Sequence, residues 1–175
     1  KCLLKVVELT LLERTVDAMI GAGIQELVVV TGYRGEMIRD FLTNHYPTLT
    51  IHFIHNADYE HNNNIFSLWM TRPFTDGKDF LLMDSDILLD PKLVKAIVKQ
   101  EGTALALNRH ECGEEEIKII VDSEGRVVEL SKTCSIADAI GESVGVERIA
   151  GDYSTALFHE LEQMIEREIE DRKSV

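Results

Sequence analysis

The sequence predicts an α/β fold in which a mostly parallel sheet is flanked by helices and carries a β-hairpin insertion. Three observations predict this class. Short apolar runs with the length of buried strands alternate with segments of helical periodicity. Capping residues, glycines and prolines separate these segments. Neither an internal repeat nor a linker interrupts the alternation, so we expect one domain that spans residues 1–175.

In the first half of the chain, the clearest boundary is a capping box. Thr10 and Glu13 stand three residues apart and begin a helical pattern over residues 10–23. Gly21 and Gly23 end this helix. The run ELVVVTG (26–32) that follows is typical of a strand buried on both faces. The other elements expected in this half are helices over residues 35–46 and 63–70 and strands over residues 48–56 and 80–83.

In the second half, Asp90 and Pro91 form an N-cap and first-turn pair that predicts a helix over residues 91–100. The polar turn at residues 122–125 divides the segment 117–130 into a β-hairpin. Further strands are expected over residues 103–108 and 142–150. Residues 153–173 predict a long helix whose buried stripe consists of Leu157, Leu161, Met164, Ile165 and Ile169.

Charge, hydropathy and cysteine usage exclude several partners. The formal net charge of −13 argues against a nucleic-acid partner, which would need a basic surface. No stretch approaches the roughly eighteen apolar residues of a membrane span, so no membrane partner is expected. Three scattered cysteines, Cys2, Cys112 and Cys134, suggest neither a disulfide framework nor a zinc spacing. The expected compartment is therefore the cytoplasm.

Two aspartates, Asp84 and Asp86, follow directly after the apolar run FLLM. In an α/β fold, ligands bind at the carboxyl ends of the strands, so both side chains are expected at such a crevice. Carboxylates one residue apart can share a hard cation, and Mg²⁺ takes one or two of them together with phosphate oxygens. The alternative is that both carboxylates accept hydrogen bonds from loop amides and cap the following turn.

Three classes of enzyme use an Asp-x-Asp pair of this kind. A haloacid-dehalogenase-type phosphatase needs threonine or valine where Leu88 stands, and it carries the pair on its opening strand. A glycosyltransferase holds a nucleotide-sugar diphosphate through the pair and a metal ion. A nucleotidyltransferase uses the metal to bridge triphosphate oxygens while a substrate phosphate attacks the α-phosphorus. The pair alone leaves the last two classes open.

Several stretches resemble one superfamily, in the same order along the chain. KCLLKVVELTLLERTVDAMIGAGIQELVVVTGY (1–33) resembles the early part of the nucleotidyltransferases that activate sugar phosphates and phosphorylated alcohols. Three later stretches resemble the branch that contains phosphocholine and 2-aminoethylphosphonate cytidylyltransferases: NADYEHNNNIFSL (56–68), ELSK (129–132) and AIGESVGVERI (139–149). The resemblance covers nearly the whole chain and implies a Rossmann-like sheet of the nucleotide-diphospho-sugar transferase type.

The resemblance also implies roles for individual residues. Asp86, together with Asp84, would bind Mg²⁺ as the cofactor. Lys1 would contact phosphate, and Lys132 would contact the phosphate or phosphonate of the acceptor, so the implied catalytic residues are Lys1, Asp86 and Lys132. The residues implied to bind the nucleotide are Asn56, Asn63, Asn64 and Ser67. The residues implied to bind the acceptor are Glu129, Lys132 and Glu142.

An enzyme follows from the resemblance, namely a Mg²⁺-dependent nucleotidyltransferase. It would transfer CMP from CTP to a small phosphorylated or phosphonated alcohol or amine, such as phosphocholine or 2-aminoethylphosphonate, and release pyrophosphate. The head group stays open, because the acidic segment 108–122 has no aromatic residue for an ammonium cage and suits a primary amine as well as choline. Alternatives are a sugar-1-phosphate nucleotidyltransferase and a non-catalytic nucleotide-sensing or assembly module on the same fold. A homo-oligomer is compatible with the sequence.

The sequence departs from the superfamily pattern at both ends. The superfamily begins with an apolar strand and a glycine-rich loop that cradles the triphosphate, and this sequence starts after both. In the superfamily, a second metal-binding carboxylate comes from a segment later than those that this sequence resembles. We therefore expect the chain to belong to a longer protein and to be inactive by itself. Without that strand, the runs ELVVVTG (26–32) and FLLMDSD (80–86) are expected to have unpaired edges.

Overall fold

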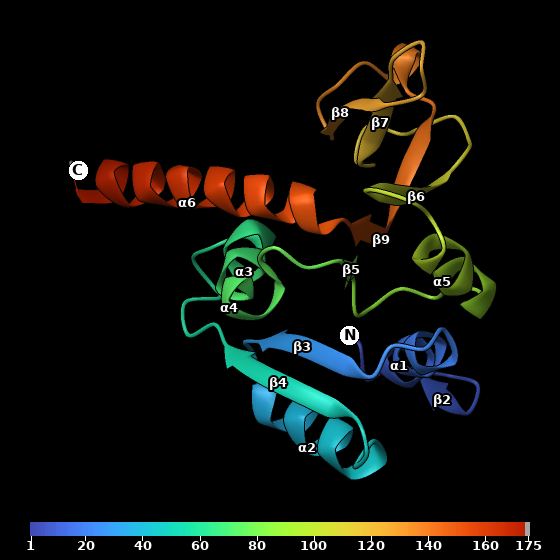
Figure 1. Cartoon of the computed structure of the whole chain (residues 1–175), viewed down its shortest axis with the longest axis vertical. Helices are drawn as coiled ribbons and strands as arrows, with labels where there is room; N and C mark the ends of the chain where they lie inside the picture. Colours follow the sequence, from blue (N-terminus) through green and yellow to red (C-terminus); the bar gives the residue numbers. More distant parts are fainter. Residues whose placement is uncertain (174–175) are drawn as a thin grey trace. The chain divides into compact units, whose positions relative to one another are not determined.

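The computed structural model describes residues 1–173 and the side chains of residues 1–167. Its helices and strands, shown in Figure 1, confirm the mixed α/β class. The chain divides into two compact units, each of which combines two separate stretches of sequence. Unit 1 consists of residues 1–18 and 81–148, and unit 2 consists of residues 19–80 and the chain from residue 149 onward.

The first stretch of unit 1 forms a small hairpin followed by a helix. The predicted capping box is confirmed, because the Thr10 amide donates to Glu13 Oε2 over 2.6 Å and the Glu13 amide donates to Thr10 Oγ1 over 3.0 Å. The hairpin is not predicted by the sequence, since each of its strands is only two residues long. These elements are β1 (Lys5–Val6), β2 (Leu9–Thr10) and α1 (Leu11–Gly21).

Five strands form the sheet of unit 1, in the order β5-β9-β7-β8 with β6 also paired to β9. The pairs β6–β9, β7–β8 and β7–β9 are antiparallel. These three pairs are antiparallel because the hairpin and the long returning strand β9 reverse the chain direction, whereas β3 (Glu26–Thr31) and β4 (Thr50–His55) of unit 2 pair in parallel. The strands are β5 (Phe80–Met83), β6 (Ala104–Asn108), β7 (Lys118–Val121), β8 (Val127–Ser131) and β9 (Gly141–Ile149).

Helix α5 (Pro91–Val98) starts where the sequence predicts. The carboxylate of Asp90 accepts a hydrogen bond from the Lys92 amide over 2.9 Å, and Pro91 occupies the first turn. The helix ends at Val98, two residues before the end of the predicted segment. Its apolar face contributes to the core of unit 1, which consists of Ile97, Ala106 and Val146 with the partly buried Leu81, Met83, Ile87, Leu89, Leu93 and Val144.

The predicted β-hairpin is present as β7 and β8, and Asp122 organises its turn. The Asp122 carboxylate accepts hydrogen bonds from the amides of Glu124 and Arg126, each over 2.9 Å. The Gly125 amide donates to the Asp122 carbonyl over 3.0 Å, and Gly125 has a φ of 80°. Only glycine adopts this backbone conformation readily, so the turn residues that the sequence singles out are the ones that close the hairpin. A 3-10 turn, Ile136–Asp138, follows.

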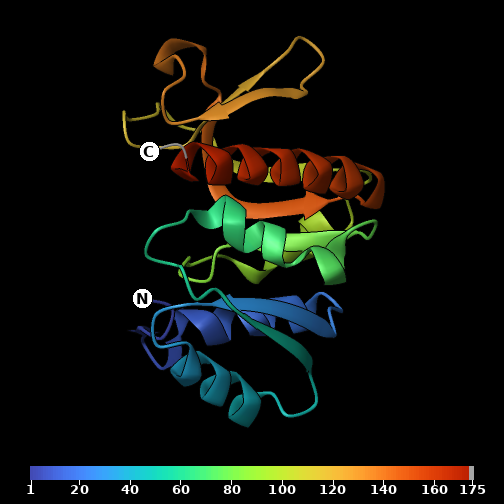
Figure 2. The same ribbon diagram turned by 90° about the vertical axis from the view of Figure 1, so that its left-hand side faces the viewer.

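Unit 2 pairs two strands in parallel, β3 (Glu26–Thr31) and β4 (Thr50–His55). Among the described residues, β3 pairs with β4 alone, so its other edge has no partner strand there. The long helix α6 packs against α3, and Figure 2 shows the two side by side. The helices of this unit are α2 (Gly35–His45), α3 (Asn64–Met70), α4 (Arg72–Thr75) and α6 (Gly151–Lys173).

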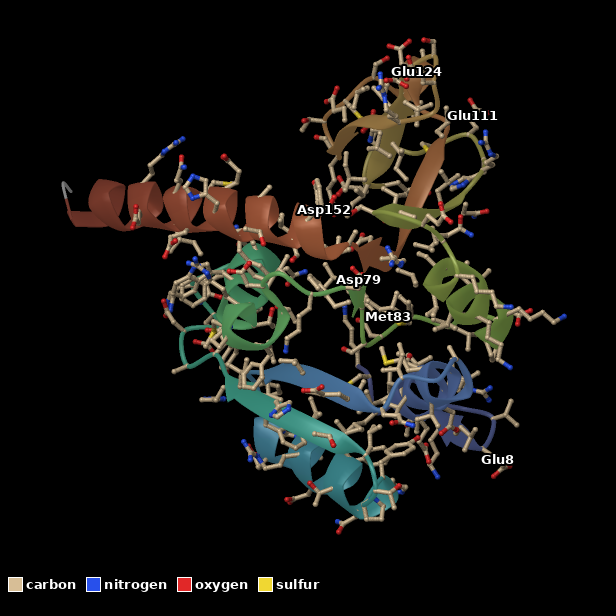
Figure 3. The ribbon with its side chains drawn as sticks, in the orientation of Figure 1. Glu8, Asp79, Met83, Glu111, Glu124 and Asp152 are labelled. Carbon is tan, nitrogen blue, oxygen red and sulfur yellow. The ribbon has the colours of Figure 1, made fainter. Side chains whose placement is uncertain are left out.

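Helix α6 starts at Gly151, two residues earlier than predicted, because side chains and backbone of the loop before β5 bind its first turn. Asp79, labelled in Figure 3, accepts a hydrogen bond from the Gly151 amide through Oδ1 over 2.8 Å. The buried Ser154 hydroxyl accepts a hydrogen bond from the Gly77 amide over 2.9 Å. A hydrogen-bond acceptor at an exposed first-turn amide stabilises a helix start.

The predicted stripe of α6 is confirmed in part. Leu161 and Ile165 are buried as predicted. Met164 is 49% exposed, so the prediction that its side chain belongs to the buried stripe is wrong. Phe158, which the stripe omits, is fully buried instead. Leu157 is half-buried, and Ile169 lies outside the described side chains. In the described part of the chain, no helix combines the length and the apolar content that a membrane crossing requires.

Candidate functional site

The Asp-x-Asp pair lies where the sequence places it, directly after β5 in unit 1. The Asp84 amide donates to the Gly145 carbonyl over 3.0 Å, which continues the contact between β5 and β9. Gly145 has a φ of 70°, and a Cβ atom at this position would collide with Oδ2 of Asp84. A glycine is therefore required for the Asp84 carboxylate to lie against the backbone of β9.

A third carboxylate, that of Glu147 on β9, joins this pair electrostatically. Removal of solvent raises the pKa of Asp84, and the negative charge of Asp86 raises it further. The pKa of Glu147 is likewise raised, first by burial and then by the charge of Asp84. Burial and neighbouring charge thus disfavour the charged forms of Asp84 and Glu147. In the described part of the chain, no basic side chain forms an ion pair with Asp84, Asp86 or Glu147.

The capping alternative for this pair has less support. Among the described residues, no amide donates a hydrogen bond to the carboxylates of Asp84 or Asp86, although the Asp90 carboxylate nearby does cap a helix. A carboxylate that caps a turn would accept such a bond. Uncompensated carboxylate oxygens at the end of a strand are the donor set that a hard divalent cation prefers. The residues present therefore fit Mg²⁺.

The predicted nucleotide-binding residues lie together in unit 2, in the loop after β4 and at the start of α3. Asn56 is only 2% exposed. Its Nδ2 donates to Asn62 Oδ1 over 2.8 Å and to Ser67 Oγ over 3.1 Å. Its Oδ1 accepts from the Asp58 amide over 3.2 Å and from Asn62 Nδ2 over 3.0 Å. All hydrogen-bonding positions of this amide are therefore used within the loop.

The two following asparagines differ from Asn56. Asn63 is the N-cap of α3, and its Oδ1 accepts from the amides of Ile65 and Phe66 over 3.1 and 3.4 Å. Asn64, the first residue of α3, is exposed. Of the four residues predicted to bind nucleotide, Asn64 is thus the one whose side chain is open to solvent without a described internal role.

The predicted phosphate-binding lysines lie at separate places in unit 1. Lys1 is exposed, and only its carbonyl has a described contact, accepting from the Leu4 amide over 2.8 Å. Lys132 follows β8, and its Nζ lies 3.9 Å from Glu115 Oε2. Both partners of this ion pair are well exposed, so the pair contributes little to stability and leaves Lys132 accessible.

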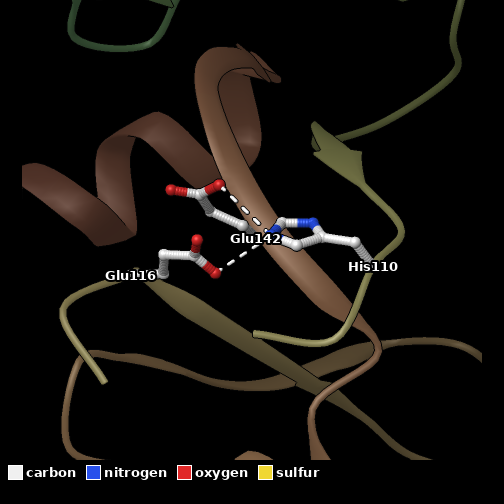
Figure 4. Close-up of side chains that lie close together, drawn as sticks. All are labelled: His110, Glu116 and Glu142. Carbon is white, nitrogen blue, oxygen red and sulfur yellow. Dashed lines mark hydrogen bonds and ion pairs between the residues drawn. The ribbon is translucent and has the colours of Figure 1, made fainter. Parts of the chain in front are cut away.

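The predicted acceptor-binding glutamates are also separated. Glu129 is exposed on β8, opposite Ile120 of β7. Glu142 lies on β9 and belongs to a cluster with His110 and Glu116, shown in Figure 4. The hydrogen bond to Glu116 raises the pKa of His110. The Gly113 amide, followed by His110, lowers the pKa of Glu116.

Sequence reasoning missed four residues of these clusters: Glu147, His110, Glu116 and Asn62. The run of three asparagines at residues 62–64 is a signal for the loop network around Asn56. For Glu147, the sequence offers no such signal, since its position beside Asp84 depends on how β9 pairs with distant strands. Likewise, only the sheet register brings Glu142 close to a histidine more than thirty residues earlier.

Comparison with solved structures identifies the fold. The structure is similar to that of CTP:phosphocholine cytidylyltransferase from Streptococcus pneumoniae, with a TM-score of 0.73 and 16% sequence identity. The similarity covers 93% of this chain and 66% of that chain. The chain has a nucleotidyltransferase fold.

Two curated relatives have similar sequences. The CMP-5'-(3-aminopropyl)phosphonate synthase of Streptomyces rubellomurinus is 30% identical over 100 residues, which are 57% of this chain and 16% of that protein. The CTP:phosphoglutamine cytidylyltransferase of Campylobacter jejuni is 22% identical over 155 residues, which are 80% of this chain and 60% of that protein. This chain thus spans only part of either relative's length. No protein-family model matches the chain.

Proposed function

We propose that the protein containing this chain is a cytidylyltransferase. It transfers CMP from CTP to a small phosphorylated or phosphonated alcohol or amine and releases pyrophosphate. The observation that carries this proposal is the group of carboxylates Asp84, Asp86 and Glu147 at the end of β5 in a nucleotidyltransferase fold. The names of both curated relatives describe cytidylyl chemistry, which favours CTP as the donor.

Asp84 and Asp86 are the residues that would hold Mg²⁺. When bound there, the cation would offset negative charge on the triphosphate and on the departing pyrophosphate. Gly145 allows the Asp84 carboxylate to approach β9, and Glu147 adds a further carboxyl group that interacts electrostatically with Asp84. Repulsion between neighbouring carboxylates destabilises their charged forms when no cation is bound. A bound cation would remove this repulsion, which favours its binding.

The other residues of the chain bind and orient the substrates. In the proposed reaction, an oxygen of the acceptor phosphate or phosphonate forms a bond to the α-phosphorus of CTP, and the bond from that phosphorus to the bridging oxygen of pyrophosphate breaks. Asn64 and Ser67 contact the nucleotide, and Lys1 and Lys132 contact phosphate or phosphonate oxygens. The Asn56 network holds the nucleotide loop in position. No side chain acts as a nucleophile, since positioning and charge compensation suffice for in-line transfer.

The test is release of pyrophosphate by the full-length protein. Each of the four nucleoside triphosphates is combined with phosphocholine, 2-aminoethylphosphonate, 3-aminopropylphosphonate and glucose 1-phosphate, in the presence of Mg²⁺. The proposal predicts release with CTP and at least one of the first three acceptors. Release only with glucose 1-phosphate would instead assign the protein to the sugar-1-phosphate class. Absence of release across the whole panel would support a non-catalytic module.

A further inference from the structure

A second cluster of metal-ligating side chains lies in unit 1. It consists of His110 in the loop after β6, Glu116 in the loop before β7, and Glu142 on β9 (Figure 4). We propose that these three side chains bind a divalent transition-metal ion of the zinc type, at a site distinct from the Asp84–Asp86 pair.

The separations between the potential ligand atoms fit such an ion. His110 Nε2 lies 3.0 Å from Glu116 Oε2 and 3.9 Å from Glu142 Oε2. All three ligand atoms lie within 4.8 Å of one another. Ligands about 2.0–2.2 Å from a tetrahedral zinc ion are about 3.4 Å apart, which falls between the two shorter distances.

The hydrogen bond at the other nitrogen of His110 orients the ring for this role. Nδ1 lies 3.2 Å from the Asn108 carbonyl oxygen. A carbonyl oxygen only accepts hydrogen bonds, so Nδ1 carries the hydrogen and Nε2 faces the two carboxylates. Metal-binding histidines usually have this arrangement, in which a carbonyl fixes the tautomer and the orientation of the ring. Without a metal, Nε2 donates to Glu116 Oε2 over 3.0 Å. A bound metal ion would replace the hydrogen on Nε2 and take its lone pair together with the two carboxylates.

The loop that carries Glu116 is held rigidly. Lys118 is 1% exposed, and its Nζ donates to the carbonyls of Gly113, Glu114 and Glu116 over 3.2, 2.9 and 3.2 Å. The Gly113 amide donates to Glu116 Oε2 over 2.9 Å. Lys118 also lies directly opposite Glu142 in the pairing of β7 with β9. The lysine ammonium therefore bonds to backbone oxygens, while the carboxylates of Glu116 and Glu142 remain directed at His110.

The site is open to an ion from solvent. The side chains of His110, Glu116 and Glu142 are 34%, 32% and 34% exposed. An imidazole nitrogen favours zinc, copper and nickel, whereas Mg²⁺ prefers oxygen ligands. The two candidate metal sites of unit 1 thus differ in chemistry, and excess Mg²⁺ should not fill the one at His110.

The experiment is a calorimetric titration of the metal-free, full-length protein with Zn²⁺ in the presence of excess Mg²⁺, followed by the visible absorption of bound Co²⁺. We expect one Zn²⁺ per chain and a Co²⁺ spectrum that Zn²⁺ abolishes. His110→Ala and Glu116→Gln should each weaken Zn²⁺ binding at least tenfold. Glu111→Gln removes the same charge from an exposed neighbour and should bind like the wild type. No nucleotide is present, so the result is independent of the proposed cytidylyl transfer.

Three results would overturn the proposal. The first is the absence of stoichiometric Zn²⁺ binding by the wild type. The second is unchanged binding by Glu116→Gln and Glu142→Gln, which decide the matter if His110→Ala fails to fold. The third is loss of binding by Cys112→Ser while Glu116→Gln still binds, because the adjacent buried thiol would then be the ligand instead.

Discussion

At the scale of single residues, Val7 is held in a conformation that its side chain disfavours. Its φ is 63°, in the turn between β1 and β2, and its side chain is 84% exposed. A β-branched residue in the left-handed region costs about 1–3 kcal/mol, and here no burial compensates for that cost. The strain is local, so it should respond to substitution at this position alone.

Val7→Gly should therefore increase the free energy of unfolding by about 1 kcal/mol, because glycine removes the strain and loses part of the gain through chain entropy. Val7→Ala is the matched control, since it keeps a Cβ atom, and it should recover less than Val7→Gly. Urea denaturation measures all three proteins. A glycine variant less stable than the wild type would show that Val7 is not strained.

Glu147 provides a pH-dependent prediction at the same scale. Its pKa is higher in the folded protein than in the unfolded chain, because of burial and the charge of Asp84. The folded state consequently binds more protons between the two pKa values, so stability falls as pH rises through that interval and stays lower above it. The contribution of Glu147 to the stability of the protein is therefore greatest below the pKa that Glu147 has in the unfolded chain.

Glu147→Gln should therefore be more stable than the wild type at pH 7 without metal, and the difference should vanish in acid. Glu101→Gln, at an exposed position, should show no such difference. Thermal unfolding across pH 3 to 8 measures both effects. If Glu147→Gln is no more stable than the wild type at neutral pH, the charge of Glu147 does not destabilise the folded protein.

At the scale of elements, the loop after β4 is organised by one buried amide. Asn56 bonds to Asn62, Ser67 and the Asp58 amide at once. Removing one partner of such a network leaves buried polar groups unsatisfied, which costs about 1–3 kcal/mol. Asn64 belongs to the same loop and helix but is exposed.

Asn56→Ala should thus lower the free energy of unfolding by about 2 kcal/mol. Asn64→Ala should leave stability nearly unchanged while raising the KM for CTP in the full-length protein. Urea denaturation and steady-state kinetics separate the two effects. The reverse pattern, with Asn64→Ala destabilising and Asn56→Ala harmless, would contradict the division between a positioning and a binding residue.

Elements whose ends depend on local contacts could be predicted from the sequence. The Thr10–Glu13 capping box, the Asp90 cap and the Asp122 turn each involve residues within four positions of one another, and all three are present. The hairpin of β1 and β2 and the short helix α4 carry too few residues to show periodicity. The antiparallel sheet could not be derived, because pairing of β9 with β6 and β7 depends on contacts distant in sequence.

The same distinction explains how much of the candidate site could be predicted. Asp84 and Asp86 are visible because they follow an apolar run directly. Glu147 reaches them only through the register of β9, and His110 meets Glu142 in the same way. The internal network of Asn56 could not be predicted either, since the sequence shows only that this asparagine belongs to a matching motif.

At the scale of the whole molecule, the predicted functions are distributed over two units. Unit 1 carries the Asp84–Asp86 pair and the His110 cluster, and unit 2 carries the asparagine loop. The net charge of −13 attracts cations to the protein and repels free anions. One fold can host several chemistries, so the fold alone does not assign the proposed cytidylyl transfer. The proposal depends on whether the carboxylates at the end of β5 bind the metal ion.

The most direct test is Mg²⁺-dependent pyrophosphate release from CTP by full-length protein carrying Asp86→Asn. We expect turnover to fall on the order of 10³-fold, because the substitution removes charge from the metal site. Asp138→Asn, at an exposed position of the same unit, should react like the wild type. Stability of Asp86→Asn should change by less than about 0.5 kcal/mol. A stable Asp86→Asn protein that retains wild-type, Mg²⁺-dependent turnover would contradict the assignment of this carboxylate to the metal.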